Sequence, residues 1–348
     1  MIKYTVPAEW EKHEATWLSW PHNKSKNHTA LNYRDVLDPI WIAMTKAIHT
    51  GENVEILVTD MEEKDHVEGL LKAETDIDMT KVHLHIVPNN DVWIRDMGPI
   101  FVRDDEGKVL ISNWGFNGWG DKYRYELDNK VPAAIQKITG MKMVDVPLIL
   151  EGGGIEINGC GDFMAAETSI VNDNRNPGKS RSEIETIITK YLGTDNFIWI
   201  DGINGSDNHD EDTDFHIDGA ARFVSKNTII CEYDPFDDED ELLHNLYEKH
   251  IRQIKFRTNK EGNLYNVIPI PVTRECVKAA GCRGSYLNYY VCNDAVIIPV
   301  YNDINDNLAI QVISGFFPGR KAVPIDVSEL FPYGGMIHCV TKQQPVAL

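Results

Sequence analysis

Cysteines are few in this chain, and none of them are paired at the spacing of a metal or redox motif. The 348 residues include 6 Cys, which is too sparse for a disulfide scaffold, and no Cys-x-x-Cys pair indicates a zinc ribbon or a thioredoxin-like site. The N-terminal residues lack the charged and then apolar order of a signal peptide, and no apolar run approaches the roughly 20 residues that span a bilayer. We therefore expect a soluble, cytoplasmic protein that does not bind a membrane.

Basic residues are also in short supply. The chain has 34 Lys and Arg against 54 Asp and Glu, a net charge of −20 with His neutral. This balance argues against a nucleic-acid partner, because binding to phosphates requires a basic patch, and it favours small cationic molecules. Hydrophobic residues at 42% and charged residues at 25% are typical of a folded globular protein. Disorder and coiled coil are thereby excluded.

No Ser-, Gly- or Pro-rich linker divides the chain, but one pattern recurs five times. A short apolar strand leads through a polar or glycine-rich loop to a second strand, and in four copies a third strand and an amphipathic helix follow. The first strands begin near residues 82, 144, 197, 267 and 322. The second strands are predicted within residues 92–99, 151–157, 215–219, 284–290 and 334–340.

Each copy is too small to fold alone, so the copies are expected to pack around a common axis within one domain, residues 1–348. Helix–strand alternation by itself is also typical of any α/β domain. If the copies share an axis, their loops converge at one end of the molecule. These loops lie near residues 89–99, 148–157, 201–219, 273–290 and 328–340.

The last copy lacks a third strand, because the chain stops soon after Cys339. Residues 15–20 precede the first long helix, around residues 36–48, and so occupy the position of the missing strand. We predict that they pair with the strand around Cys339, which leaves no unpaired edge there. A strand at residues 54–58 has no counterpart in the other copies.

Converging loops would bring Asp96, Glu151, His216, Asp218 and Cys339 into one site. A cysteine thiol has an ordinary pKa of about 8.5, and neighbouring carboxylates oppose its ionisation. The combination makes sense if the substrate itself is a cation. A planar guanidinium suits it, since two carboxylates can accept its N–H groups while its central carbon faces the sulfur.

Four ordered motifs resemble those of a known family. They are residues 90–99 (NDVWIRDMGP), 151–154 (EGGG), 214–219 (DFHIDG) and 334–345 (GGMIHCVTKQQP). Together with residues 6–10 (VPAEW), they resemble the agmatine deiminases of the guanidino-group-modifying, or pentein, superfamily. The resemblance covers essentially the whole chain. It implies an α/β fold in which ββαβ-type repeats form a five-bladed pseudo-symmetric propeller around a central site.

The resemblance also implies an activity and roles for the site residues. The family hydrolyses agmatine to N-carbamoylputrescine and ammonia, in putrescine (polyamine) biosynthesis, without metal or organic cofactor. Cys339 would be the nucleophile that forms an amidino-thioether, and His216 would be the acid and base. Asp96 and Asp218 would clamp the guanidinium, and Glu151 would assist at the same group.

Further residues are assigned to substrate binding. Trp93 and Trp119 are candidate walls of the site, because aromatic faces attract cations, and Gly335 precedes the nucleophile. Asp212 stands where the family often has Glu, and Met336 stands where it commonly has Asn. Asp212 is the candidate for the far end of the substrate.

Other interpretations remain open. A deiminase of free or peptidyl arginine would need an arginine at the pocket mouth, for which Arg95 and Arg283 are candidates. A non-catalytic pentein that only binds a ligand is a further alternative, which the intact Cys, His and Asp set argues against. The acidic run 207–214 lacks the spacing of a calcium loop and is predicted to be a solvated loop. The sequence is compatible with a homo-oligomer.

The other cysteines are predicted to be structural, because a cysteine without a reactive context is usually an inert buried side chain. They are Cys160, Cys231, Cys276, Cys282 and Cys292.

Overall fold

The computed structural model describes residues 3–25, 27–28, 30, 32–203, 212–235 and 241–348. It is a mixed α/β fold in which the described strands form sheets of three or four strands and one separate two-stranded pair. No helix among these residues is long and apolar enough to cross a bilayer.

One unit recurs: two antiparallel strands, a helix, and a third strand parallel to the second. A helix connects the last two strands because a parallel pair cannot be joined by a tight turn. The first copy is β4 (Ile100–Arg103), β5 (Val109–Gly115), α5 (Val131–Thr139) and β6 (Met143–Ile149). The second is β7 (Glu156–Ile157), β8 (Asp162–Ala166), α6 (Arg181–Leu192) and β9 (Asn196–Ile200).

Two more copies follow in the second half of the chain. The third is β10 (Ala221–Ser225), β11 (Thr228–Tyr233), α7 (Glu241–Lys255) and β12 (Asn266–Pro271). The fourth is β15 (Tyr290–Val291), β16 (Ala295–Val300), α8 (Asp306–Gly315) and β17 (Lys321–Asp326). The short pair β13 (Cys276–Val277) and β14 (Cys282–Arg283) lies between them. The predicted ββαβ repeat is confirmed.

The helices follow from local sequence. Ser180 and Glu183 form a capping box at the start of α6, and Gly193 ends the helix in the left-handed conformation, which glycine adopts without a steric penalty. Ile184 and Ile188, about one turn apart on this helix, are fully buried.

The two chain ends meet in one sheet. Strand β18 (Lys342–Pro345) is antiparallel to β1 (His13–Ser19), with Thr16 opposite Gln343. Through α1 (Tyr33–Ile48), β1 continues to the parallel strand β2 (Asn53–Val58). The predicted pairing of the N-terminal segment with the C-terminal end of the chain is therefore confirmed, but the partner strand begins at Lys342 and does not include Cys339.

The strand without a counterpart is also explained. Strand β2 is the third strand of this unit, and α2 (Met61–Ala73) leads from it to an added fourth strand, β3 (Val82–Ile86).

The predicted second strands are mostly wrong. Residues 92–99 contain the short helix α3 (Ile94–Met97), and residues 215–219 contain the 3₁₀ helix η5 (Ile217–Gly219). Residues 284–289 and 334–340 form no strand. The physical reason is that their backbone groups form local turns, such as the bond from Asp96 N–H to the Trp93 carbonyl, and bonds between the segments, such as that from Arg95 N–H to the Cys339 carbonyl. The strands begin only after them.

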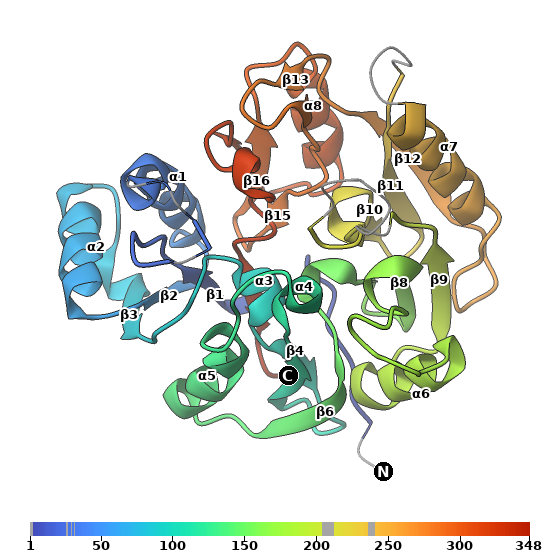
Figure 1. Cartoon of the computed structure of the whole chain (residues 1–348), viewed down its shortest axis with the longest axis horizontal. Helices are drawn as coiled ribbons and strands as arrows, with labels where there is room; N and C mark the ends of the chain where they lie inside the picture. The colour runs from blue at the N-terminus through green and yellow to red at the C-terminus, as the bar shows by residue number, and fades with distance from the viewer. Residues whose placement is uncertain (1–2, 26, 29, 31, 204–211, 236–240) are drawn as a thin grey trace.

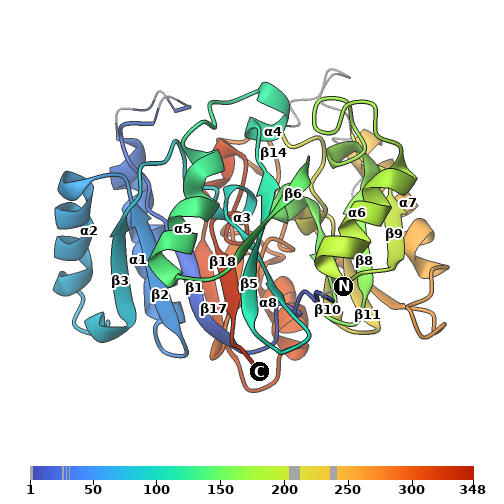
Figure 2. The ribbon, with the colours of Figure 1, turned by 90° about the horizontal axis from the view of Figure 1, so that it is seen from below.

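Short helices lie at the middle of the molecule. Figure 1 shows successive parts of the chain arranged around α3 and α4 (Gly118–Asp121), with α2, α5, α6 and α7 at the outside. In the view turned by 90°, α4 lies at one edge and the C-terminus at the opposite edge (Figure 2). A closed five-bladed propeller remains a prediction.

Three tryptophans anchor the N-terminal strand in the core. Trp17, Trp20 and Trp41 are at most 1% exposed. Each indole N–H has an acceptor, as a buried indole requires: Trp17 donates to Gln344 at 2.9 Å, Trp20 to Asp38 at 2.7 Å, and Trp41 to the Ser19 carbonyl at 2.9 Å. The Trp17 bond joins β1 to β18.

Replacing Trp17 tests how much this closure contributes. We expect Trp17→Ala to lower the free energy of unfolding by about 3–5 kcal/mol, because it empties a buried site and removes the bond to Gln344. Urea denaturation followed by circular dichroism measures the change. The control is Met61→Ala, at a side chain that is 57% exposed, which should change stability by less than about 0.5 kcal/mol. Equal effects of the two variants would contradict the closure.

Candidate active site

The predicted residues surround a cavity of about 380 Å³. It is lined by Asp96, His216, Asp218 and Cys339, together with the predicted binding residues Trp93, Trp119 and Asp212. They come from Trp93 and α3, from α4, from residues 212–218 and from the turn before β18, segments that are far apart in sequence. The volume suits a small molecule.

Asp96 is fixed by two hydrogen bonds. Its Oδ1 accepts the backbone N–H of Gly153 at 2.8 Å, and its Oδ2 accepts the indole N–H of Trp119 at 2.9 Å. Nδ1 of His216 lies 3.7 Å from the same Oδ2. Burial raises the pKa of Asp96, and although His216 lowers it, the charges of Asp218 and Glu151 raise it further. His216 therefore compensates only part of the cost of burying this carboxylate.

Gly153 lies where three of these side chains converge. A Cβ atom there would be 2.8 Å from His216 Nδ1, 2.9 Å from Asp96 Oδ1 and 3.0 Å from Asp218 Oδ2. No larger residue fits between them without moving at least one. The glycine of the EGGG motif therefore permits the close approach of the two carboxylates and the imidazole.

Glu151 lies beside His216 and does not line the cavity. It is fully buried, its Oε2 is 3.5 Å from His216 Nε2, and its Oε1 accepts the Nε–H of Arg175 at 2.7 Å. Arg175 also donates to Asp214 at 2.6 Å. This arrangement places Glu151 next to the imidazole rather than on the open surface where a guanidinium would lie. Arg175 was missed by sequence reasoning, since it belongs to none of the motifs.

The charge on His216 follows from these neighbours. Burial alone would lower its pKa, but Asp96, Glu151 and Asp218 raise it to about 9. The imidazole is therefore protonated at neutral pH and can act as an acid.

The surroundings that favour the charged form of His216 favour the neutral form of the Cys339 thiol. Burial raises its pKa well above the ordinary value, and Asp218 and Asp96 raise it further. Its Sγ accepts an N–H of the Asn288 side chain at 3.2 Å and lies 3.8 Å from Asp218 Oδ2. Asn288, a polar residue within the otherwise aromatic and apolar run 286–291, is a site residue that sequence reasoning missed.

Glycine is also required at position 335, four residues before the nucleophile. A Cβ atom at Gly335 would come within 2.5 Å of Trp93 Cζ3 and 3.1 Å of Cys339 Sγ. Gly335 is thus in contact with the cavity wall and the thiol, although it does not itself line the cavity.

The cavity lining contains further carboxyl groups besides Asp96 and Asp218. Asp212 Oδ1 accepts the hydroxyl of Tyr123 at 2.9 Å, and Asp91 and Glu232 line the same cavity. Burial raises the pKa of Glu232 to about 8, against hydrogen bonds from Ser285 and Tyr247. Glu232, in β11, belongs to none of the motifs, and sequence reasoning therefore missed it.

The arginine candidates differ in position. Arg95 is buried behind the nucleophile, where its Nε–H donates to the His338 carbonyl at 3.1 Å. Arg283 does line the cavity and pairs with Asp234 at 2.8 Å. Of the cysteines predicted to be structural, Cys231 and Cys292 are buried, whereas Cys282 is exposed and lines the cavity.

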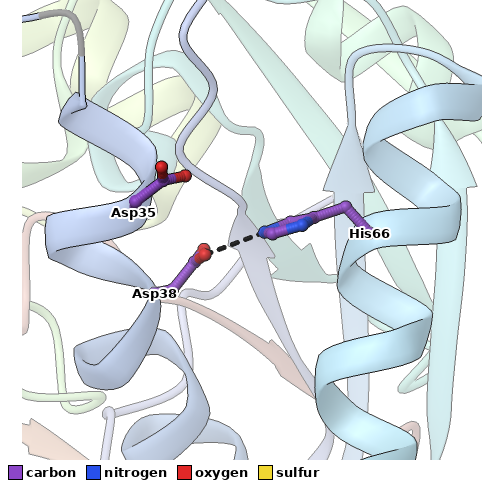
Figure 3. A group of neighbouring side chains, drawn as sticks. All are labelled: Asp35, Asp38 and His66. Atoms are coloured by element: carbon purple, nitrogen blue, oxygen red, sulfur yellow. Dashed lines mark hydrogen bonds and ion pairs between the residues drawn. The ribbon is translucent and has the colours of Figure 1, made fainter.

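A candidate cation-binding group lies elsewhere, between α1 and α2. Figure 3 shows Asp35, Asp38 and His66 facing one another. Asp38 already pairs with His66 at 2.8 Å and accepts the Trp20 indole N–H, and Asp35 pairs with Arg34 at 2.8 Å. These bonds account for the group, and we assign no metal to it. Of the predicted acidic loop 207–214, residues 207–211 lie outside the described part of the chain.

Comparison with known proteins identifies the family. The model of the Porphyromonas-type peptidyl-arginine deiminases matches residues 5–345. The chain belongs to this family. It is 31% identical to a Legionella pneumophila protein named "Putative agmatine deiminase", over 98% of this chain and 95% of that protein. A Streptomyces coelicolor protein of the same name is 30% identical over 99% of both.

Solved structures agree with this assignment. A Cys→Ser variant of the C. jejuni agmatine deiminase with substrate bound has a TM-score of 0.84 and 28% identity, over 100% of this chain and 97% of that one. The predicted resemblance to agmatine deiminases and to the pentein superfamily is confirmed.

The tight contact at Gly335 can be tested by substitution, with a second glycine as the control. We expect Gly335→Ala to reduce ammonia release from a guanidino substrate by about 10-fold or more, since the added methyl group must displace Trp93 or Cys339 and a small misplacement of reacting groups is costly. Gly315→Ala is the control, because a Cβ there meets nothing within 4 Å. Similar activity of both variants would show that the tight contact at Gly335 is dispensable.

The raised pKa of His216 predicts a pH dependence. Because the folded-state pKa is about 9 and the ordinary value is 6.5, the stabilisation from His216 is complete below about pH 6.5 and is lost as pH rises through about 9. We expect NMR to record the His216 imidazole titrating near 9, with His216→Gln used to assign its signal. Urea unfolding should show the stability advantage of the wild type over that variant shrinking across this range. Titration near 6.5 would contradict the carboxylate cluster.

Proposed function

We propose that this protein hydrolyses agmatine to N-carbamoylputrescine and ammonia through a covalent intermediate on Cys339. The observation that carries the proposal is the charge of the cavity: a partly exposed thiol lies beside Asp96 and Asp218, which raise its pKa. A bound guanidinium would reverse this effect by compensating the carboxylates, so the nucleophile would be activated by its own substrate.

The carboxylates supply the binding geometry. Asp96 and Asp218 both lie around Gly153 and can accept N–H groups from opposite sides of a planar guanidinium. Asp218 Oδ2 lies 3.8 Å from Cys339 Sγ, so a guanidinium bound to it would present its central carbon to the sulfur. Glu151, beside His216 and paired with Arg175, would orient the imidazole.

The proposed reaction proceeds in two halves. When the guanidinium binds, the thiol proton leaves to solvent and the thiolate of Cys339 attacks the central carbon. The C–N bond to the departing nitrogen breaks as His216 gives it a proton, and ammonia leaves an amidino-thioether. Neutral His216 then takes a proton from water, and the hydroxide adds to the same carbon. The C–S bond breaks as the new hydroxyl group gives up its proton to the departing sulfur, which releases the ureido product and restores the thiol.

The rest of the cavity suits a cationic tail. Asp212 is our candidate for the agmatine ammonium, and Asp91 and Glu232 add carboxyl groups to the lining of the same cavity. Trp93 and Trp119 can enclose the aliphatic chain and the cations. We place these residues in one domain, residues 1–348, whose repeat loops meet at the site in a five-bladed arrangement, and we place the reaction in putrescine biosynthesis.

A deiminase of peptidyl or free arginine is the second candidate, favoured by the family description and by Arg283 in the cavity wall. Arg283 is ion-paired to Asp234 at 2.8 Å, so binding a substrate carboxylate would compete with that pair. The surplus of acidic side chains in the cavity favours a tail that is positive.

Ammonia release from agmatine, free arginine and an arginyl peptide decides between the two. We expect agmatine to have the highest kcat/KM. Cys339→Ala should lose about 10⁴-fold or more, as removal of a nucleophile does, and Asp96→Asn about 10²-fold or more. Cys160→Ala, at an exposed cysteine outside the cavity, is the control with normal activity. Near-normal turnover of Cys339→Ala would refute the covalent mechanism, and a higher kcat/KM for the peptide would favour the second candidate.

A further inference from the structure

The residue before the nucleophile, His338, is buried between two carboxylates. It is 1% exposed. Its Nδ1 lies 2.7 Å from Asp218 Oδ2 and its Nε2 lies 2.8 Å from Glu9 Oε2. Both distances are those of hydrogen bonds. The imidazole therefore connects Asp218, at the cavity, with Glu9, in the N-terminal segment.

These contacts fix the number of protons that the three groups share. An ionised carboxylate can only accept a hydrogen bond, and a neutral imidazole donates from one nitrogen only. Two short N···O contacts therefore require two protons: an imidazolium between two carboxylates, or an imidazole with one protonated carboxyl group. The three groups titrate as one unit.

Fixed cations surround this unit. Glu9 pairs with Arg222 at 3.1 Å and lies 3.6 Å from Arg95, and Arg222 also pairs with Glu156 at 2.5 Å. Burial opposes ionisation of Glu9, but Arg222 and His338 hold its pKa well below the ordinary value. Burial, Arg222 and Arg95 lower the pKa of His338, against Glu9 and Asp218.

The same unit is joined to the nucleophile. Asp218 Oδ2, which contacts His338, is the oxygen that lies 3.8 Å from Cys339 Sγ. The backbone N–H of His338 donates to the Asn288 carbonyl at 3.0 Å, and the Asn288 amide contacts the Cys339 sulfur at 3.2 Å. A substitution of His338 is therefore expected to affect both the Asp218 carboxylate and the Cys339 thiol.

We propose that His338 is a positioning residue for the deimination, and that Glu9 sets its proton content through the chain Glu9–His338–Asp218. The inference rests on the proposed function, in which Asp218 binds the guanidinium. The hydrogen bond from His338 holds Asp218 Oδ2 beside the thiol and favours its ionised form. The N-terminal segment thereby acts on the site without contacting the substrate.

Two substitutions of His338 separate its two bonds. The amide of His338→Asn can reach Asp218 in place of Nδ1, whereas the amide of His338→Gln can reach Glu9 in place of Nε2. We expect His338→Gln to lose about 10- to 100-fold in kcat/KM, the effect of losing a hydrogen bond to a charged group, and His338→Asn to lose clearly less. A role in folding alone would not rank the two variants in this order.

Glu9→Gln tests the proton count without a change of shape. The amide introduced by this substitution would donate to Nε2, which leaves His338 neutral with its proton at Nδ1 toward Asp218. Because the network then holds one proton fewer, Asp218 takes up a proton more readily, so we expect the acidic limb of the kcat/KM profile to move to higher pH. His13→Gln is the matched control: His13 is also buried and contacts Glu9 only at its backbone carbonyl, at 2.7 Å. It should leave the limb unmoved.

A readout without substrate separates failure of this inference from failure of the proposed function. Peptide mapping gives the rate at which iodoacetamide alkylates Cys339 as a function of pH. In His338→Gln we expect this profile to move to higher pH, because Asp218 is still ionised at the alkaline pH at which the thiol titrates and no longer has the Nδ1–H donor that offsets its charge. If the wild type hydrolyses no guanidino substrate, the proposed function fails, and the alkylation profile still decides the inference. The inference about His338 would be overturned if the acidic limb of kcat/KM in Glu9→Gln and the alkylation profile in His338→Gln matched those of His13→Gln.

Discussion

The structure of the site depends on negative charge that is buried beside a thiol. Asp96 and Asp218 lie at the cavity with little exposure, and their charges disfavour a thiolate at Cys339. Such charges are costly to bury unless they are paired or hydrogen-bonded. The protein meets this cost with donors that point at the carboxylates: the Gly153 backbone and the Trp119 indole for Asp96, and His338 for Asp218. Without a ligand, Asp96 and Asp218 still favour the binding of a cation between them.

The arginines that pair with the supporting carboxylates lie outside the cavity lining. Arg175 pairs with Glu151, and Arg222 pairs with Glu9 and Glu156. These guanidinium groups stabilise the carboxylates that support the site while leaving Asp96 and Asp218 for another partner. A cation as rigid and as weakly hydrated as arginine is suited to such buried pairs. The arrangement explains how an acidic cavity can persist in the absence of its ligand.

The meeting of the chain ends is part of the same design. Pairing of β1 with β18 fixes the turn that carries Cys339, and the segment just before β1 brings Glu9 to His338. Residues about 330 positions apart in sequence thereby share a proton network. The bulky indoles of the N-terminal segment fill the core beside this pairing, so folding of the sheet and assembly of the site are coupled.

Part of this was readable from the sequence, because hydrophobic periodicity and glycine patterns are local. The repeat of strands and helices, the closure by residues 15–20 and the set of Asp96, His216, Asp218 and Cys339 all follow from such signals. The motifs also placed Glu151 and Gly335 near the site. The prediction of the second strands failed because a short helical turn and a short strand have similar apolar patterns over four or five residues.

The sequence by itself determined which chemical groups the site contains and, through its motifs, the family to which the chain belongs. Only the tertiary structure decided how those groups are used. It put Glu151 beside the imidazole rather than at the cavity surface, and it brought Asn288, Arg175, Glu232 and His338 into contact with the site. The physical reason is that hydrogen bonds and pKa values depend on distances between segments remote in sequence, and no local pattern encodes those distances.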